Sequence, residues 1–107
     1  MKILFDMHYV ICYDLENDRL RDRVAKLLQK QGCSRVQRSV FVARGLERRE
    51  YSALRTALRR LLARHPCGPA DSLLFIPLRE GEETRIEAIG LNNAVTSLAA
   101  PPLKIIL

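Results

Sequence analysis

The sequence predicts an α+β fold in which two helices cover one face of a mostly antiparallel sheet. Short β-rich segments alternate along the chain with amphipathic helical segments, and Gly, Pro and Asn residues separate them. The chain has 107 residues, of which 48% are hydrophobic, so it is long enough to bury one core. These observations indicate a single domain over residues 1–107, without internal repeats.

The first strand and the first helix are predicted from adjacent segments. Residues 9–15 carry apolar side chains on both faces of the predicted strand, except for Asp14 near its end. A strand that is apolar on both faces is typical of the centre of a sheet. Asn17 or Asp18 can cap the helix that follows. Residues 19–31 place leucine and valine at helical spacing, and Gly32 ends the helix.

A second strand and a second helix come next. Residues 36–43 are β-rich, but strict alternation would place Arg38 among valines, so a bend is expected near Ser39. Gly45 is expected to close this segment. Residues 47–65 predict a helix whose first turn is acidic and whose last turn is basic, as the helix dipole favours.

The C-terminal part of the chain is predicted to add strands. Residues 72–78 form a strand, residues 80–82 turn the chain, and residues 84–89 return as another strand. Residues 90–100 are expected to be an irregular connection. The apolar tail, residues 103–107, is expected to join a sheet edge of its own chain or of a partner.

The sheet face that the helices leave open needs a cover. Tyr13 or Phe41 is expected on this face, where the side chain would be exposed in a monomer. A homodimer that stacks sheet against sheet is the simplest cover. Phe41 is alternatively a core residue, or a residue that stacks on a base or on the second copy.

The composition favours a phosphate-rich partner and excludes several classes of protein. The net charge is +6 and the pI about 9.7, with fourteen Arg against four Lys. Arg binds phosphate through a planar fork, so nucleic acid is the expected partner. No signal peptide or membrane span is recognised. The three cysteines form no CxxC pair, so we expect a reducing cytoplasm, no zinc site and no disulfides.

Asp14 is the candidate metal ligand. Asp is depleted in strands and poorly suited to a core. Its carboxylate either caps a turn or helix, or binds a hard cation such as Mg²⁺, which needs only one or two carboxylates besides water and phosphate. A two-fold axis would bring two Asp14 side chains together. No acidic or His cluster elsewhere completes a nuclease centre, and His8 and His65 are expected at the surface and at a helix end.

Basic side chains form rows on both predicted helices and continue on the second strand. They either contact a nucleic-acid backbone or form an ordinary solvated surface. The candidate contacts are Arg19, Arg23, Lys26, Lys30, Arg38, Arg55 and Arg59.

A family resemblance is visible in the segment YDLENDRLRDRVAKLLQKQGCSRVQRSVF, which resembles the second CRISPR-associated protein, the small partner of the adaptation integrase. The Tyr-Asp pair, the Arg-x-Arg of the first helix and the string RVQRSVF carry it together. It continues more loosely through the second helix and the strands DSLLFIPL and RIEAIG. The resemblance implies a ferredoxin-like fold in a two-fold dimer. RVQRSVFVA would divide into two short strands, and a C-terminal strand within residues 90–107 would cross to the second copy.

The resemblance also implies roles for individual residues. Asp14 would be the metal-binding carboxylate, shared across the dimer. The surrounding residues linked to nuclease activity would be Tyr13, Arg21, Arg23, Arg35 and Phe41. At Arg38 the sequence departs from the family, which commonly has Tyr or another residue there.

Three functions are compatible with these features. The first is a magnesium-dependent endonuclease in which Asp14 from both chains holds the ion, with RNA or DNA as its substrate. The second is a non-catalytic, dimeric scaffold that holds DNA and the adaptation integrase during spacer acquisition. The third, a regulatory or RNA-binding module, is least favoured because the sheet lacks paired aromatic residues for stacking.

Overall fold

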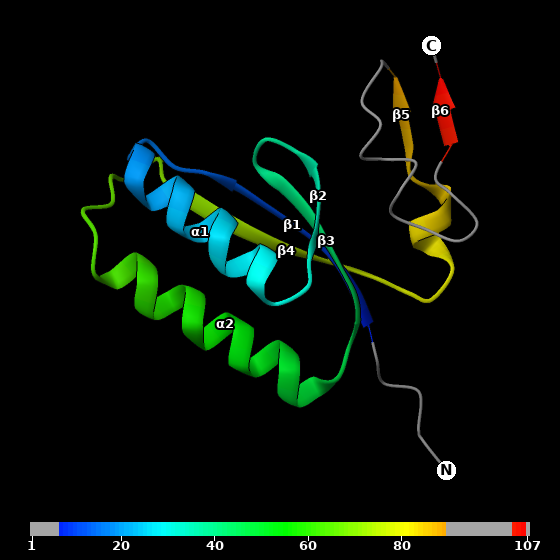
Figure 1. Ribbon diagram of the computed structural model, residues 1–107, viewed down its shortest axis with the longest axis horizontal. Coiled ribbons are helices and arrows are strands. Elements are labelled where there is room, and N and C mark those ends of the chain that lie inside the picture. Colours follow the sequence, from blue (N-terminus) through cyan, green and yellow to red (C-terminus); the bar gives the residue numbers. More distant parts are fainter. Residues whose placement is uncertain (1–6, 90–103, 107) are drawn as a thin grey trace.

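The computed structural model describes residues 7–89 and 104–106. The elements follow in the order β1 (Met7–Asp14), α1 (Asp18–Lys30), β2 (Ser34–Gln37), β3 (Val40–Leu46), α2 (Arg48–Ala63), β4 (Ser72–Leu78), the 3₁₀ helix η1 (Glu82–Arg85), β5 (Glu87–Ile89) and β6 (Lys104–Ile106). Strands β1 to β4 form one antiparallel sheet in the order β2-β3-β1-β4, and both α-helices cover the same face of it (Figure 1). The predicted α+β class is confirmed.

Local sequence defines both helices. Asn17 caps α1, because its Oδ1 accepts a hydrogen bond from the Leu20 amide at 2.9 Å. Gly32 follows that helix with a φ of +87°, a left-handed conformation that favours glycine. At the start of α2, the Glu47 amide donates to Glu50 Oε1 at 2.9 Å as part of a capping box. Among the described residues, no helix is long and apolar enough to cross a membrane.

The main core lies between the helices and the sheet. Ile11 and Tyr13 point from β1 into this layer, together with the buried leucines of both helices. Phe41 pairs with Ile11 across β3 and β1, so it faces the same side of the sheet and is 0% exposed. The expectation that Tyr13 or Phe41 would occupy the open face is therefore wrong, and the alternative that Phe41 is a core residue is confirmed. The valines that alternate with Phe41 face that side instead.

The open face of the sheet is apolar and only partly covered. A small cluster around Val42 has Ile86 and Ala88 packed against it. The edge strand β4 carries Leu74 and Ile76 on the same face, and their side chains are 54% and 44% exposed. The need for a cover therefore remains, although the residues that create it differ from those expected.

Strands β2 and β3 divide where the bend was expected. Arg38 and Ser39 form the turn between them, and the pairing register shifts between Arg35 and Gln37. The turn releases Arg38 from the valine face into solvent. Strand β3 then continues past Gly45 to Leu46 rather than ending at the glycine.

The predicted return strand over residues 84–89 is wrong in its first half. The chain passes through Gly81, at a φ of +92°, into the 3₁₀ helix η1, and the strand itself covers only residues 87–89. Strand β5 does not pair with β4. It pairs in parallel with β6 instead. The apolar tail was expected to join a sheet edge either of its own chain or of a partner, and here residues 104–106 join an edge of their own chain. The predicted connection over residues 90–100 lies outside the described residues.

Candidate active site at the end of the first strand

Asp14 is the last residue of β1, and its side chain is exposed. Because side chains alternate along a strand, Asp14 lies on the open face with Val10 and the half-buried Cys12, whereas Tyr13 lies under the helices. The Asp14 carboxylate makes no hydrogen bond or ion pair with another described residue. It is therefore available to a ligand from solvent.

Other residues fill the structural roles that were open to Asp14. Asn17 caps α1. Asp71 accepts hydrogen bonds from the Glu16 amide at 3.1 Å and from the Gly68 amide at 2.9 Å, so it ties the loop after β1 to the loop before β4. No contact between described residues requires the charge of Asp14. Asp14 thus stays a predicted metal ligand, and the alternative of a capping carboxylate has no support.

Tyr13, Phe41 and Arg35 form a cluster beneath the end of β1. The Tyr13 and Phe41 rings are stacked with their centroids 6.3 Å apart, and Arg35 Cζ lies 5.3 Å from the Phe41 centroid. Burial raises the pKa of the Tyr13 phenol, and the charge of Arg35 and hydrogen bonds with Ser39 and Arg35 only partly oppose this. Tyr13 is therefore a neutral phenol at physiological pH, suited to hydrogen bonding rather than to acting as a base.

Arg35 and Arg21 hold backbone segments on either side of this cluster. Arg35 donates through Nη2 and Nε to the Arg38 carbonyl at 2.7 and 3.3 Å, which closes the β2–β3 turn. Arg21 donates through Nη1 to the carbonyls of Leu15 and Glu16 at 2.6 and 3.1 Å. These bonds fix the turn after β1. The structure thus brings Tyr13, Arg21, Arg35 and Phe41 of the predicted set together, with Phe41 as a buried support.

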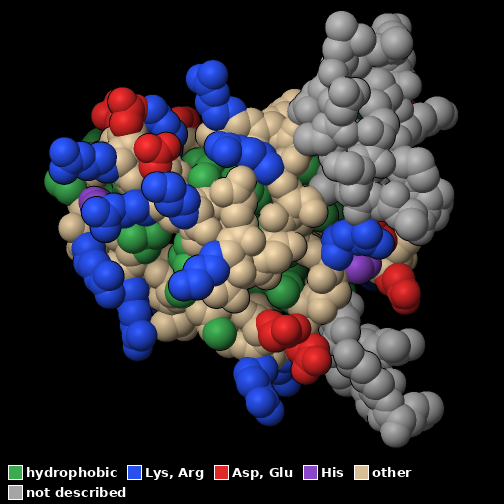
Figure 2. All heavy atoms as spheres, viewed as in Figure 1, with side chains coloured by type: hydrophobic (Ala, Val, Ile, Leu, Met, Phe, Trp, Pro, Cys, Tyr) green, Lys and Arg blue, Asp and Glu red, His purple; other side chains and the backbone are tan. Residues whose placement is uncertain are grey.

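The remaining predicted basic residues lie at several separate positions. Arg23 and Lys26 line a groove between α1 and α2, while Arg55 and Arg59 line another hollow between α2 and β4. The other three predicted contacts, exposed outside both hollows, are Arg19, Lys30 and Arg38. Figure 2 shows Lys and Arg side chains spread over the helix layer, with hydrophobic side chains visible between them.

Asp14 is the acidic member of the residue set predicted for this site. Among the described residues, no three His, Cys, Asp or Glu side chains gather where they could hold one metal ion. An exposed and unpaired carboxylate nevertheless fits Mg²⁺, which keeps several waters and binds few protein ligands. A second copy of Asp14 would double the negative charge offered to the ion.

Sequence reasoning missed Glu83 and misplaced His8. Glu83 is 6% exposed, and its Oε2 lies 3.3 Å from His8 Nε2 and 3.8 Å from Arg44 Nη2. His8 Nδ1 accepts a hydrogen bond from the Gly45 amide at 2.8 Å. His8 is therefore largely buried rather than a surface residue. No sequence signal joins two residues this far apart, because only the fold places η1 beside β1.

Comparisons with known proteins point to one family. The family model described as CRISPR associated protein Cas2 matches residues 7–86. A CRISPR-associated endoribonuclease Cas2 from Synechocystis sp. is 37% identical over 82 residues, which cover 77% of this chain and 83% of that protein. Another, from Pyrobaculum aerophilum, is 47% identical over 38 residues, which cover 36% of this chain and 42% of that protein.

A solved structure has the same fold. The crystal structure of a hypothetical protein from Thermus thermophilus matches with a TM-score of 0.62 and 32% sequence identity. The match covers 80% of this chain and 93% of that chain.

The burial of Phe41 leads to a stability prediction. We expect Phe41→Ala to lower the free energy of unfolding by about 3–5 kcal/mol, because a fully buried ring leaves a cavity under β1 and β3. The control Arg19→Ala changes an exposed side chain and should stay within about 0.5 kcal/mol. Urea unfolding followed by circular dichroism measures both. A loss below about 1 kcal/mol for Phe41→Ala would contradict the burial of this ring.

Proposed function

The chain belongs to the Cas2 family of CRISPR-associated proteins, and we propose that it is a metal-dependent endonuclease that acts as a homodimer in CRISPR adaptation. The observation that carries the proposal is the exposed Asp14 carboxylate, which has no partner among the described residues. The relatives from Synechocystis and Pyrobaculum are named endoribonucleases, so RNA is the first substrate to test. DNA is the second.

Dimerisation would complete the metal site. Asp14 lies on the same face of the sheet as the exposed Leu74 and Ile76. Stacking two copies through this face would cover the apolar side chains and bring both Asp14 carboxylates into the same interface. A magnesium ion held there would supply a Lewis acid that activates water and offsets phosphate charge.

Arg21 and Arg35 would act as positioning residues. Each donates to backbone carbonyls of a turn next to the end of β1. They therefore hold the segment that carries Asp14 and Tyr13 in one geometry, which a reaction at a fixed ion requires. Phe41 would support the same geometry from within the core.

The alternative is a non-catalytic scaffold that binds nucleic acid and the adaptation integrase. The placement of the cations favours a scaffolding contribution, because Arg55, Arg59 and Lys30 lie on the helix layer, whereas Asp14 lies on the open face. Cations on the helix layer suit contacts with a nucleic-acid backbone that lies away from Asp14. The two roles are compatible in one dimer.

Asp14→Asn should abolish divalent-dependent cleavage of RNA or DNA by the purified protein. The amide keeps the shape of the side chain but removes the charge that a hard cation requires, and a symmetric dimer loses both carboxylates at once. The matched control is Asp22→Asn, which removes the same charge from an exposed position on α1 and should cleave normally.

Cleavage is measured on labelled oligonucleotides with magnesium or with a chelator. Wild-type activity in Asp14→Asn would remove Asp14 from the mechanism. If that variant lost cleavage but still supported spacer acquisition in cells, the scaffold would be the biologically required role.

The wild-type chain should have about twice its 12.2 kDa mass in light scattering at micromolar concentration. Ile76→Glu should shift the mass toward the monomer, because a charge on the open face opposes stacking of two sheets. Thr56→Glu is the control, since Thr56 is exposed on α2. A monomeric wild-type protein would contradict the proposed dimer.

Nucleic-acid binding should weaken steeply with salt and depend little on sequence. Arginine contacts to phosphate release counterions, and few side chains on these surfaces can read base edges. We expect the affinity for a labelled oligonucleotide to fall by at least about tenfold between 50 and 200 mM salt. An affinity that is unchanged over this range would argue against phosphate contacts.

A further inference from the structure

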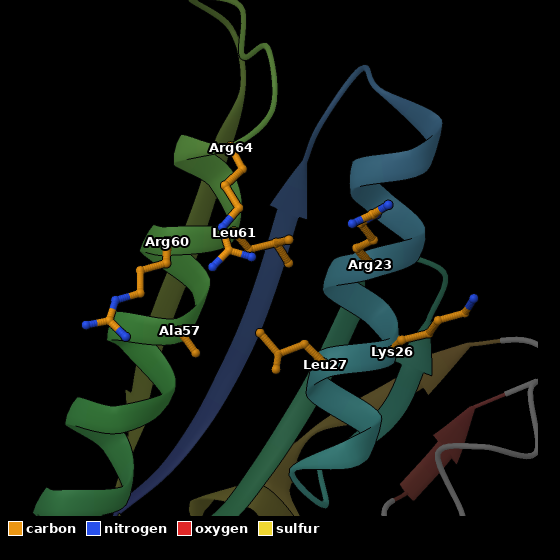
Figure 3. Close-up of a pocket in the computed structure, with 7 residues that line it drawn as sticks. All are labelled: Arg23, Lys26, Leu27, Ala57, Arg60, Leu61 and Arg64. Atoms are coloured by element: carbon orange, nitrogen blue, oxygen red, sulfur yellow. The ribbon is translucent and has the colours of Figure 1, made fainter.

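Helices α1 and α2 leave a groove of about 410 Å³ between them, within the range of pockets that accept ligands. Its rims carry four cations: Arg23 and Lys26 on α1, and Arg60 and Arg64 on α2. In Figure 3 the Lys26 and Arg60 side chains extend outward from their helices, away from the space between them. No acidic side chain is among the described residues that line it. None of the four cations makes an ion pair or a side-chain hydrogen bond with another described residue. The groove is therefore positively charged, and no described side chain of opposite charge neutralises it.

These cations differ from the arginines near Asp14. The donors of Arg21 and Arg35 bind carbonyls of the chain itself, so those side chains hold the fold together. The cations at the groove have no comparable task among the described residues. Four like charges around one depression repel each other, and an anionic partner would relieve that repulsion.

The floor of the groove is aliphatic. Leu27, Ala57 and Leu61 are half-buried and point into the space between the helices (Figure 3). Leu27 and Leu61 also contact the main core. A partner that covered only the rims would leave this apolar surface in water, so a well-fitting partner combines negative charge with aliphatic groups.

This combination argues against a nucleic acid as the occupant. Single-stranded bases bind by stacking on aromatic side chains, and the part of the chain that the structure describes places no aromatic residue in the groove. Within residues 7–89 and 104–106, no uncharged polar side chain lines it to read a base edge. A phosphate backbone would satisfy the cations but offers nothing to the leucines.

We propose that this groove docks an acidic amphipathic peptide segment of a partner protein. Its aliphatic side chains contact Leu27 and Leu61, and its Asp or Glu side chains pair with the cations on the rims. Peptide segments bind grooves between helices in this manner, with apolar anchors and flanking charges. The site goes beyond the proposed nuclease function, because it lies on the helix layer rather than on the face that carries Asp14.

The test uses fluorescence anisotropy with the full chain and a synthetic helical peptide built from Leu and Glu. Arg60→Gln/Arg64→Gln should bind this peptide about tenfold more weakly than the wild type, because two ion pairs are lost. The matched control is Arg48→Gln/Arg49→Gln, which removes the same charge from exposed positions at the other end of α2. It should change the affinity less than about twofold. Gln has nearly the helix propensity of Arg, so both variants should fold.

Two further ligands distinguish binding in the groove from non-specific electrostatic attraction. A peptide with Ser in place of Leu should bind at least about tenfold more weakly, because it cannot cover the floor. A single-stranded DNA oligonucleotide of the same charge should lose no more affinity in the groove variant than in the control variant. The proposal is overturned if the two double variants bind the Leu-Glu peptide equally, or if the Ser peptide binds as well as the Leu peptide. It is also overturned if only the oligonucleotide distinguishes the variants.

Discussion

The alternation of side chains along β1 is the constraint on which the rest of the structure depends. This strand pairs with β3 on one side and with β4 on the other. Its odd-numbered side chains, including Ile11 and Tyr13, contact the helix layer, while Val10 and Asp14 lie on the open face. A shift of one residue would turn the Asp14 carboxylate into the core and expose the tyrosine. One register therefore determines both the core and the availability of the candidate ligand.

The helices and the main strands could be predicted because their signals are local. The cap at Asn17 and the glycine at Gly32 act on neighbouring residues, and so do the leucine stripes. The place of Phe41 stayed open between the core and the uncovered face, because alternation separates two faces of a strand without showing which face the helices cover. The return strand failed for a similar reason: Glu83 contacts His8 and Arg44, and these distant contacts hold the chain in a 3₁₀ turn beside β1.

A residue of the candidate site could be predicted where its side chain is chemically unsuited to its position in the fold. An Asp at the end of an apolar strand has no structural reason to be there, and the structure supplies none among the described residues. Arginines carry no such signal, because Arg21 and Arg35 serve backbone turns while Arg60 and Arg64 border a groove. Amino-acid composition alone cannot distinguish an arginine that holds a backbone turn from one that borders a groove. The difference arises only when α1 and α2 lie side by side.

The parallel pairing of β5 with β6 has a consequence for how two copies could associate. Glu87 is paired with Lys104, and Ile89 with Ile106, within one chain. In a dimer, β5 of the second copy could accept the same strand with the same hydrogen bonds, so reciprocal strand exchange would conserve every backbone contact of this small sheet. Closed monomers and interlocked pairs would then differ mainly in chain entropy and in concentration. In the single chain, residues 104–106 pair with β5 of the same copy, so exchange between copies would need an equal number of open and accepting strands.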